Sequence, residues 1–205
     1  MGLVRILDIS KSGAWRGTDI LYLRRTLGLA KTLVILLDKL NISSVRDFGC
    51  GNDGYVEASI NSGIKTYGFD GNLDTRKLNT PGDHCIGPLD VTSLQSWNQK
   101  DAAVSIELEE VRSHHVMDTY LTNLVNNAQK LVILSWGRSG QGGEGQVNGQ
   151  TAKDLEEKMK KYGSKTNKRH TFFLHAICNK YSINNIKSNV QVSKKCDSGN
   201  ECTPT

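Results

Sequence analysis

The stretch SVRDFGCGNDG, residues 44–54, decides which fold class this chain can adopt. It starts as a short strand pattern and stops at Gly49, Gly51 and Gly54, which are spaced as G-x-G-x-x-G. A helix pattern then runs from Gly54 to Ser62. A strand, a glycine turn and a helix in this order predict one unit of an open α/β sheet, in which ligands bind at the carboxyl ends of the strands.

Outward from this unit, apolar patterns of helical and strand period alternate along the chain. The sequence predicts helices at 19–40, 115–127 and 152–162, strands at 43–48, 65–70, 84–87, 102–108 and 131–136, and a terminal hairpin near Phe172 and Val190. We therefore expect a single domain over residues 1–195 and a tail at 196–205. The expected fold is α/β, with a mostly parallel sheet, a final antiparallel strand and helices on both faces.

The composition of the 205 residues, 37% hydrophobic and 23% charged, suits a globular domain and excludes a disordered or fibrous chain. The longest apolar run, Leu33 to Leu37, is far shorter than the roughly 18 residues that a membrane span needs. Charges at Arg5, Asp8 and Lys11 interrupt the amino terminus where a signal peptide would be apolar. We therefore expect a cytoplasmic protein that does not enter a membrane.

Five cysteines without paired, ligand-like spacing argue against a disulfide scaffold and against a metal site. We expect Cys178, Cys196 and Cys202 to be reduced thiols, and no metal to be bound. The net charge of +5 leaves nucleic acid or an acidic surface open as a partner.

Two acids near the glycine turn indicate the cofactor. Asp70 ends the predicted strand at 65–70, about 20 residues after the turn, where a carboxylate bonds ribose hydroxyls in nucleoside sites. Asp47 lies two residues before Gly49, where its charge would repel a pyrophosphate and attract an ammonium or sulfonium group. S-adenosylmethionine (SAM) carries both groups and no phosphate, so these residues favour SAM over NAD. The alternatives are a tight turn without a ligand and a plain strand-end position for Asp47.

Four segments resemble the SAM-dependent methyltransferases with a seven-stranded, Rossmann-like fold: VRDFGCGNDGY, YGFDGN, LDVTS and DAAVSIELEEV, in that order. More narrowly, YGFDGN, VSIELEE and ILSWGRSGQGGEGQVN are similar to a poorly characterised methyltransferase-like family with the motifs DGN, SLEVxEH and SWxxxGQGGxGHVN. The resemblance covers roughly residues 42–162. It implies a three-layer fold, a mostly parallel seven-stranded sheet with an antiparallel last strand, and SAM-dependent methyl transfer to an acceptor that the motifs do not identify.

The resemblance also implies which residues form the cofactor site. Adenosine would lie between the glycine turn and Asp70, with Asp90 and Val91 near the adenine. The expected cofactor-binding residues are Asp47, Gly49, Gly51, Gly54, Asp70, Gly71, Asn72, Asp90, Val91 and Glu107.

Three residues are candidates for an acid, a base or a positioning group on the acceptor side: Glu107, Glu110 and His114. Methyl transfer needs chiefly proximity and alignment, and a base only where the acceptor must lose a proton. A plain surface position is the alternative for His114, which adjoins His115 at a predicted helix start.

The family pattern has a histidine after the acid of its E-H pair, where this chain has Val111, and two histidines in a GHGHVN-like stretch, where this chain has Glu144 and Gln146. If those histidines bind a metal or act as bases in relatives, this chain lacks that chemistry at these positions. The rival interpretation is therefore a non-catalytic SAM-binding or interaction protein of the same fold.

Residues 135–149 contain six glycines and follow a predicted strand, which indicates a flexible loop over the substrate. Its candidate substrate contacts are Trp136, Arg138, Gln141 and Asn148. The alternative for this segment is a surface loop without a function in binding. The alternative for Trp136 is a place in the hydrophobic core.

The stretch KMKKYGSKTNKRH, Lys158 to His170, alternates cations with small polar residues and could contact phosphates. RNA is therefore a candidate methyl acceptor, in addition to a small molecule or a protein. A solvated helix end is the alternative interpretation.

Overall fold

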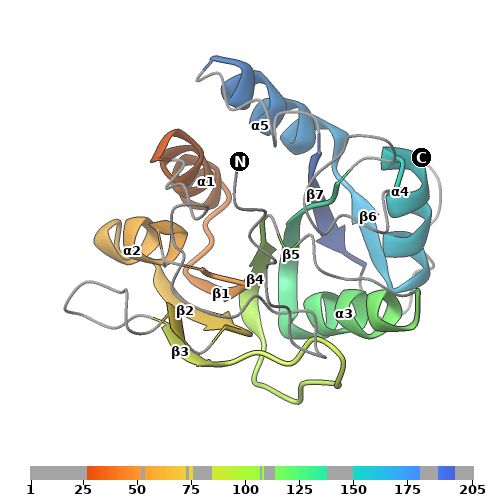
Figure 1. Cartoon of the computed structure of the whole chain (residues 1–205). Coiled ribbons are helices and arrows are strands. Elements are labelled where there is room, and N and C mark those ends of the chain that lie inside the picture. The colour runs from red at the N-terminus through yellow and green to blue at the C-terminus, as the bar shows by residue number, and fades with distance from the viewer. Residues whose placement is uncertain are drawn as a thin grey trace, which may run out of the picture.

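The computed structural model describes residues 27–51, 54–72, 74–75, 85–106, 108, 114–137, 150–180 and 189–196. Its helices are α1 (Leu27–Lys39), α2 (Gly54–Asn61), α3 (His114–Asn127), α4 (Ala152–Lys161) and α5 (Lys168–Lys180). Its strands are β1 (Ser44–Phe48), β2 (Lys65–Asp70), β3 (Cys85–Pro88), β4 (Lys100–Ser105), β5 (Ala128–Ser135), β6 (Ser164–Thr166) and β7 (Val190–Lys195). Figure 1 shows how these elements are arranged.

The seven described strands form one sheet in the order β3-β2-β1-β4-β5-β7-β6. Strands β3, β2, β1, β4 and β5 pair in parallel, whereas β7 is antiparallel to both β5 and β6. The expected α/β fold, with a mostly parallel sheet and an antiparallel last strand, is confirmed. Strand order reverses between β1 and β4, so their carboxyl ends flank the crevice in which open α/β sheets bind ligands.

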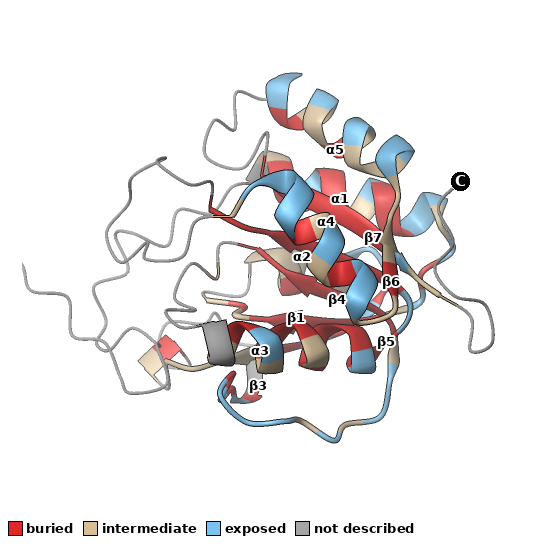
Figure 2. Cartoon of the chain, turned by 90° about the vertical axis from the view of Figure 1, so that its right-hand side faces the viewer, coloured by how far each residue is buried: buried red, intermediate tan, exposed pale blue. Residues whose placement is uncertain are grey.

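Helices cover both faces of the sheet, and each face has its own hydrophobic core (Figure 2). On one face, Leu33 of α1 and Leu174 of α5 pack on the strands, and α2 lies beside α1. On the other face, Leu121 of α3 and Met159 of α4 pack together with apolar strand residues. The result is the three-layer arrangement that the sequence predicts.

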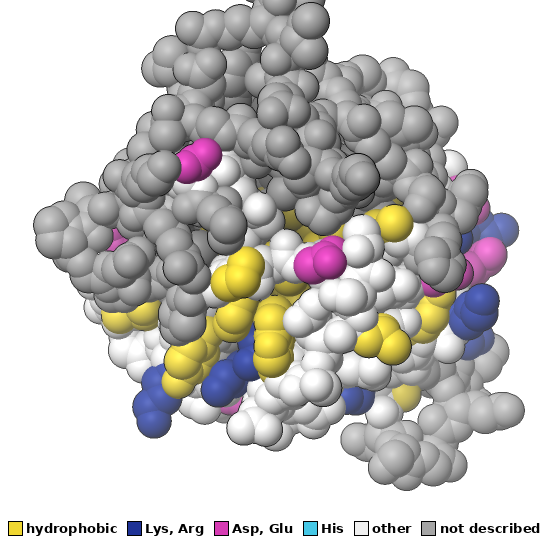
Figure 3. All heavy atoms as spheres, turned by 60° about the horizontal axis from the view of Figure 1, so that its bottom comes forward, with side chains coloured by type: hydrophobic (Ala, Val, Ile, Leu, Met, Phe, Trp, Pro, Cys, Tyr) yellow, Lys and Arg dark blue, Asp and Glu magenta, His cyan; other side chains and the backbone are white. Residues whose placement is uncertain are grey.

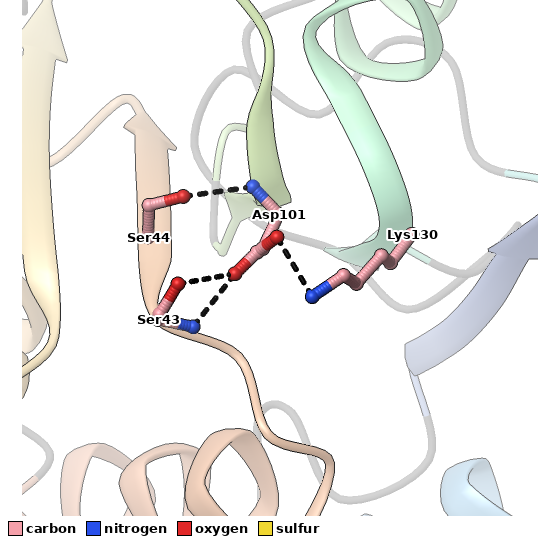
Figure 4. Close-up of polar contacts among 4 residues, drawn as sticks. All are labelled: Ser43, Ser44, Asp101 and Lys130. Carbon is pink, nitrogen blue, oxygen red and sulfur yellow. Dashed lines mark hydrogen bonds and ion pairs between the residues drawn. The ribbon is translucent and has the colours of Figure 1, made fainter.

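A buried carboxylate fastens the amino ends of β1, β4 and β5 (Figure 4). Asp101 accepts hydrogen bonds from the Ser43 amide at 2.8 Å and the Ser43 hydroxyl at 2.7 Å, and it pairs with Lys130 Nζ at 2.9 Å. The Asp101 amide donates to the Ser44 hydroxyl at 3.0 Å. Burial alone would raise the pKa of Asp101, but Lys130 and the Ser43 donors hold it at about 2. This ionised side chain therefore ties three central strands together at the edge opposite their carboxyl ends.

The expected terminal hairpin is wrong in part. Phe172 lies within α5, and the strand at Val190 pairs with β6, a strand that the sequence pattern does not predict. Leu174 and Cys178 are four residues apart and both buried, which is the spacing of one helix face. Polar and aromatic neighbours obscure this short apolar stripe, so the local pattern does not reveal the helix.

The expectation of reduced thiols is wrong for Cys196, which is disulfide bonded. Cys178 is a free, buried thiol, and Cys202 lies outside the described residues. The domain limits, 1–195 with a tail from 196, stay a prediction.

An aromatic side chain covers the sheet where no helix connects β3 to β4. Residues 89–99, all of which the structure describes, contain no helix, and Trp97 of this segment packs on the sheet. Its ring stacks on Phe69 with the centroids 4.3 Å apart and lies tilted against Phe48 at 5.8 Å. The Arg46 guanidinium lies 4.7 Å from the centre of the Trp97 ring. On this side of the molecule, hydrophobic side chains gather next to basic ones (Figure 3).

We predict that Trp97→Ala destabilises the fold by about 2 kcal/mol, because the change removes the aromatic stack and uncovers Arg46. Urea denaturation followed by circular dichroism measures the loss. The matched control is Leu94→Ala in the same segment, whose side chain is 69% exposed and should change stability by less than about 0.5 kcal/mol. Equal effects of the two changes would contradict a covering function for Trp97.

Candidate functional site

The turn after β1 requires glycine. Gly49 and Gly51 have φ angles of 82° and 54°, in the left-handed region that glycine adopts without strain. The amides of Gly49 and Cys50 donate to the Phe69 carbonyl at 2.7 and 3.1 Å, which ties the turn to β2. A Cβ atom on Gly49 would lie 2.5 Å from Leu108 Cδ1. Glycine at position 49 therefore leaves the room that the Leu108 side chain occupies.

Asp70 joins the loops that follow β1 and β2. Its carboxylate accepts hydrogen bonds from the Gly51 amide at 2.8 Å and from the Asn72 amide at 2.7 Å, one on each oxygen. Its carbonyl accepts from the Leu89 amide at 2.9 Å, next to β3. Burial raises the pKa of Asp70, and the two amide donors oppose this rise. Each carboxylate oxygen keeps a further lone pair for a ligand donor.

Asp47 is the most unusual side chain at this edge. It is only 2% exposed, and neither carboxylate oxygen has a hydrogen-bond partner. Burial, and secondly the charge of Asp70, raise the pKa of Asp47 to about 7. A buried carboxylate without a partner is costly to the stability of the fold.

Two further polar side chains, which no sequence motif indicates, lie near Asp47. The Ser105 hydroxyl at the end of β4 donates to the Phe48 carbonyl at 2.7 Å. Tyr120 of α3 is fully buried, and burial, with a smaller contribution from Asp47, raises its pKa. Its spacing from Met117 and Leu124 predicts burial, but no local pattern brings its hydroxyl close to Asp47.

The other expected cofactor residues lie in or next to the same region. Gly54 begins α2, and Gly71 follows the end of β2. Asp90 is exposed and accepts from the Thr92 amide at 2.9 Å, while Val91 is 8% exposed and joins the core. Their contact with a cofactor stays a prediction.

The glycine-rich segment begins and ends at the carboxyl end of β5. The Gln150 amide donates to the Gly137 carbonyl at 3.1 Å, which brings the two ends of the segment together. Trp136 is 8% exposed and packs against Tyr120 with the ring centroids 5.9 Å apart, so the structure favours its core alternative. The side chains of six predicted site residues lie outside the described structure: Glu107, Glu110, His114, Arg138, Gln141 and Asn148.

No protein-family model and no curated protein matches this chain. Solved structures do match it. Magnesium protoporphyrin IX methyltransferase (ChlM) from Synechocystis, with bound S-adenosylhomocysteine (SAH), aligns with a TM-score of 0.61 at 12% identity, over 83% of this chain and 84% of that chain. The sugar N-methyltransferase KedS8 from Streptoalloteichus aligns with a TM-score of 0.64 at 8% identity, over 85% of this chain and 89% of that chain.

The chain has the fold of class I SAM-dependent methyltransferases. The same fold also carries another activity, because the [4+2]-cyclase SpnF aligns with a TM-score of 0.57 at 11% identity, over 82% of this chain and 81% of that chain. The comparison therefore assigns architecture, and the site must supply the function. None of the described helices has the length and apolar content needed to cross a membrane.

We predict that Asp47→Asn stabilises the ligand-free chain at about pH 8, by a few kcal/mol and at most about 4. The pKa of Asp47 is raised from 3.8 to about 7, so the folded state takes up a proton between these values. Wild-type stability from this group therefore falls as the pH rises from about 4 to about 7, and asparagine abolishes that fall.

Urea denaturation of both proteins between about pH 5 and pH 8 measures this difference. Asp38→Asn, at an exposed position of α1, is the matched control and should keep the wild-type fall in stability, because Asp47 is unchanged. A variant that is less stable than wild type at about pH 8 would mean that the ionised Asp47 already has a stabilising partner.

Proposed function

We propose that this chain binds SAM across the carboxyl ends of β1 and β2 and transfers its methyl group to an acceptor. The observation that carries the proposal is the buried Asp47 carboxylate, which has no partner and stands directly before a glycine turn with positive φ angles. A ligand with an ammonium group satisfies this carboxylate, directly or through water. A ligand with a pyrophosphate would place like charges together, which is why we favour SAM over NAD.

The remaining cofactor contacts follow from the same geometry. The Gly49 and Gly51 turn allows close approach of the ligand to the backbone, and Asp70 keeps carboxylate lone pairs for the ribose hydroxyls. Gly71 and Asn72 continue this loop, and we assign Asp90 and Val91 to the adenine side. We also assign Gly54 and Glu107 to the edge of the cofactor site.

When bound, SAM supplies a methyl group activated by a sulfonium centre. The chain's own contribution would be to align the acceptor with that group and to exclude water. We assign Glu107, Glu110 and His114 to the acceptor side, as acid, base or positioning groups. Arg138, Gln141 and Asn148 would orient the acceptor from the segment whose two ends meet at β5.

A second candidate is a SAM-binding protein of this fold that does not transfer a methyl group. Two observations favour it: this chain has Val111, Glu144 and Gln146 where the similar family motifs have histidines, and SpnF, which has the same fold, is a cyclase. This candidate shares the cofactor site and differs only on the acceptor side.

The cytoplasmic location stays a prediction. The disulfide at Cys196 argues against it, because structural disulfides are rare in a reducing cytosol. Alkylation of the protein directly from cells, followed by mass spectrometry, decides whether this bond exists there.

We predict that Asp70→Ala weakens SAM binding by about ten- to a hundredfold, because charge-assisted hydrogen bonds of this kind contribute about 1.5–3 kcal/mol. Isothermal titration calorimetry with SAM and SAH measures the change, and NAD should bind more weakly than either. Asp38→Ala on the exposed face of α1 is the control and should bind SAM as wild type does. Unchanged affinity in Asp70→Ala would remove Asp70 from the cofactor site.

The test of methyl transfer uses SAM with an isotopically labelled methyl group. We expect cell extract incubated with the wild-type chain to yield a labelled product by mass spectrometry, and extract with Asp47→Asn to yield none. Tight SAM binding without any labelled product would contradict methyl transfer and support the second candidate. A product that appears equally with Asp47→Asn would contradict the assigned site.

A further inference from the structure

The charge of this chain is divided unevenly along its length. Residues 158–196 contain ten lysines and arginines and no aspartate or glutamate. Since the whole chain has a net charge of +5, the residues outside this segment together carry −5. A concentration of one sign in one segment points to a partner of the opposite charge.

The fold gathers this segment at one edge of the sheet. The segment includes the end of α4 and all of β6, α5 and β7, and these elements lie together on one side of the molecule (Figure 1). Lys165 of β6 and Lys194 of β7 are register partners across the two strands. The cations are therefore close in space as well as in sequence.

One face of α5 is exposed and combines cations with an aromatic ring. Leu174 and Cys178 point into the core, which leaves the opposite face of the helix to solvent (Figure 2). Lys168 and Arg169 lie four and three residues before Phe172, so the three side chains share that outer face. The Phe172 side chain is 74% exposed, which is unusual for so large an apolar group.

Three cations at this edge have no acidic partner within the part of the chain that the structure describes. Lys168, Arg169 and Lys194 make no ion pair with any described residue. Burial lowers the pKa of His170, and the charges of Lys194, Arg169 and Lys39 lower it further. Cations from α1, α5 and β7 therefore converge around one point.

We propose that this basic edge, formed by Lys39, Lys168, Arg169, Phe172 and Lys194, binds single-stranded nucleic acid. Cations that follow a phosphate backbone, next to an exposed ring on which a base can stack, are the two elements of sequence-tolerant single-strand binding. A base presents its face to such a ring only when it is unpaired, which favours a single strand over a duplex.

The same surface does not suit a membrane. A helix that lies on a bilayer buries a continuous apolar face between the lipids. The apolar face of α5, with Leu174 and Cys178, is already packed against the sheet. Phe172 alone on the outer face cannot supply that area.

The basic edge is distinct from the proposed cofactor site. Lys39 ends α1 before β1 begins, and Lys194 pairs with Leu131 near the amino-terminal half of β5. Both belong to the part of the sheet away from its carboxyl ends. Binding here goes beyond the proposed methyl transfer and requires no SAM, so the two proposals are tested separately.

The experiment measures fluorescence anisotropy of a labelled oligouridylate of about 20 nucleotides with the full chain, at several salt concentrations and without SAM. We expect Lys168→Ala with Arg169→Ala to reduce the slope of log affinity against log salt by about 1.4, because each lost phosphate contact removes about 0.7. The matched control removes two exposed lysines elsewhere, Lys65→Ala with Lys153→Ala, and should leave the slope unchanged.

A third variant separates stacking from charge. Phe172→Ala should weaken binding by about five- to a hundredfold with an unchanged salt slope, because base stacking on one ring is worth about 1–3 kcal/mol. Leu94→Ala, which removes another exposed apolar side chain, is its control and should bind as wild type does.

Four outcomes would overturn the proposal. The first is no binding of the oligouridylate at low salt, and the second is equal loss in the basic-edge variants and their controls, which would mean attraction by net charge alone. The third is unchanged affinity in Phe172→Ala. The fourth is binding to phosphatidylserine vesicles without binding to the oligouridylate, which would indicate a membrane surface instead.

Discussion

The two hydrogen bonds that the Asp70 carboxylate accepts are the interaction on which the arrangement at the carboxyl ends of β1 and β2 depends. It accepts one amide from the loop after β1 and one from the loop after β2, at Gly51 and Asn72, so it sets the relative positions of both loops. The Phe69 carbonyl adds the amides of Gly49 and Cys50 to the same junction. The two amide donors hold the Asp70 carboxylate in one orientation. Recognition of a sugar hydroxyl requires an acceptor that is held in this way.

Asp47 lies beside this junction and differs from Asp70, because its carboxylate accepts no hydrogen bond. Its burial costs stability in the ligand-free chain, and a cationic ligand would recover that cost on binding. The Asp47 carboxylate would therefore lower the stability of the free chain and raise its affinity for a cation, a trade-off that is common at preformed binding sites. The raised pKa of Asp47 is the measurable sign of what burial of its charge costs in stability.

The two outer edges of the sheet, at β3 and at β6, differ in the side chains that they carry. At the β3 end, a segment without a helix covers the sheet through Trp97, which packs on Phe69 and beside Arg46. At the β6 end, β6, α5 and β7 carry cations and belong to a segment, residues 158–196, that contains no aspartate or glutamate. The fold thus separates the acids Asp47 and Asp70, at the carboxyl ends of β1 and β2, from the cations around Lys194.

The sequence by itself determined the order of most helices and strands, because hydrophobic period, glycine turns and strand ends are local signals. It placed β2 at its observed bounds and brought Asp47, Gly49 and Asp70 to adjacent strand ends, since parallel strands end on one edge. Only the tertiary structure decided that residues around Phe172 form a helix, that Tyr120 lies near Asp47, and that the Asp47 carboxylate has no partner. Those features depend on contacts between residues far apart in the chain, and no local pattern records such contacts.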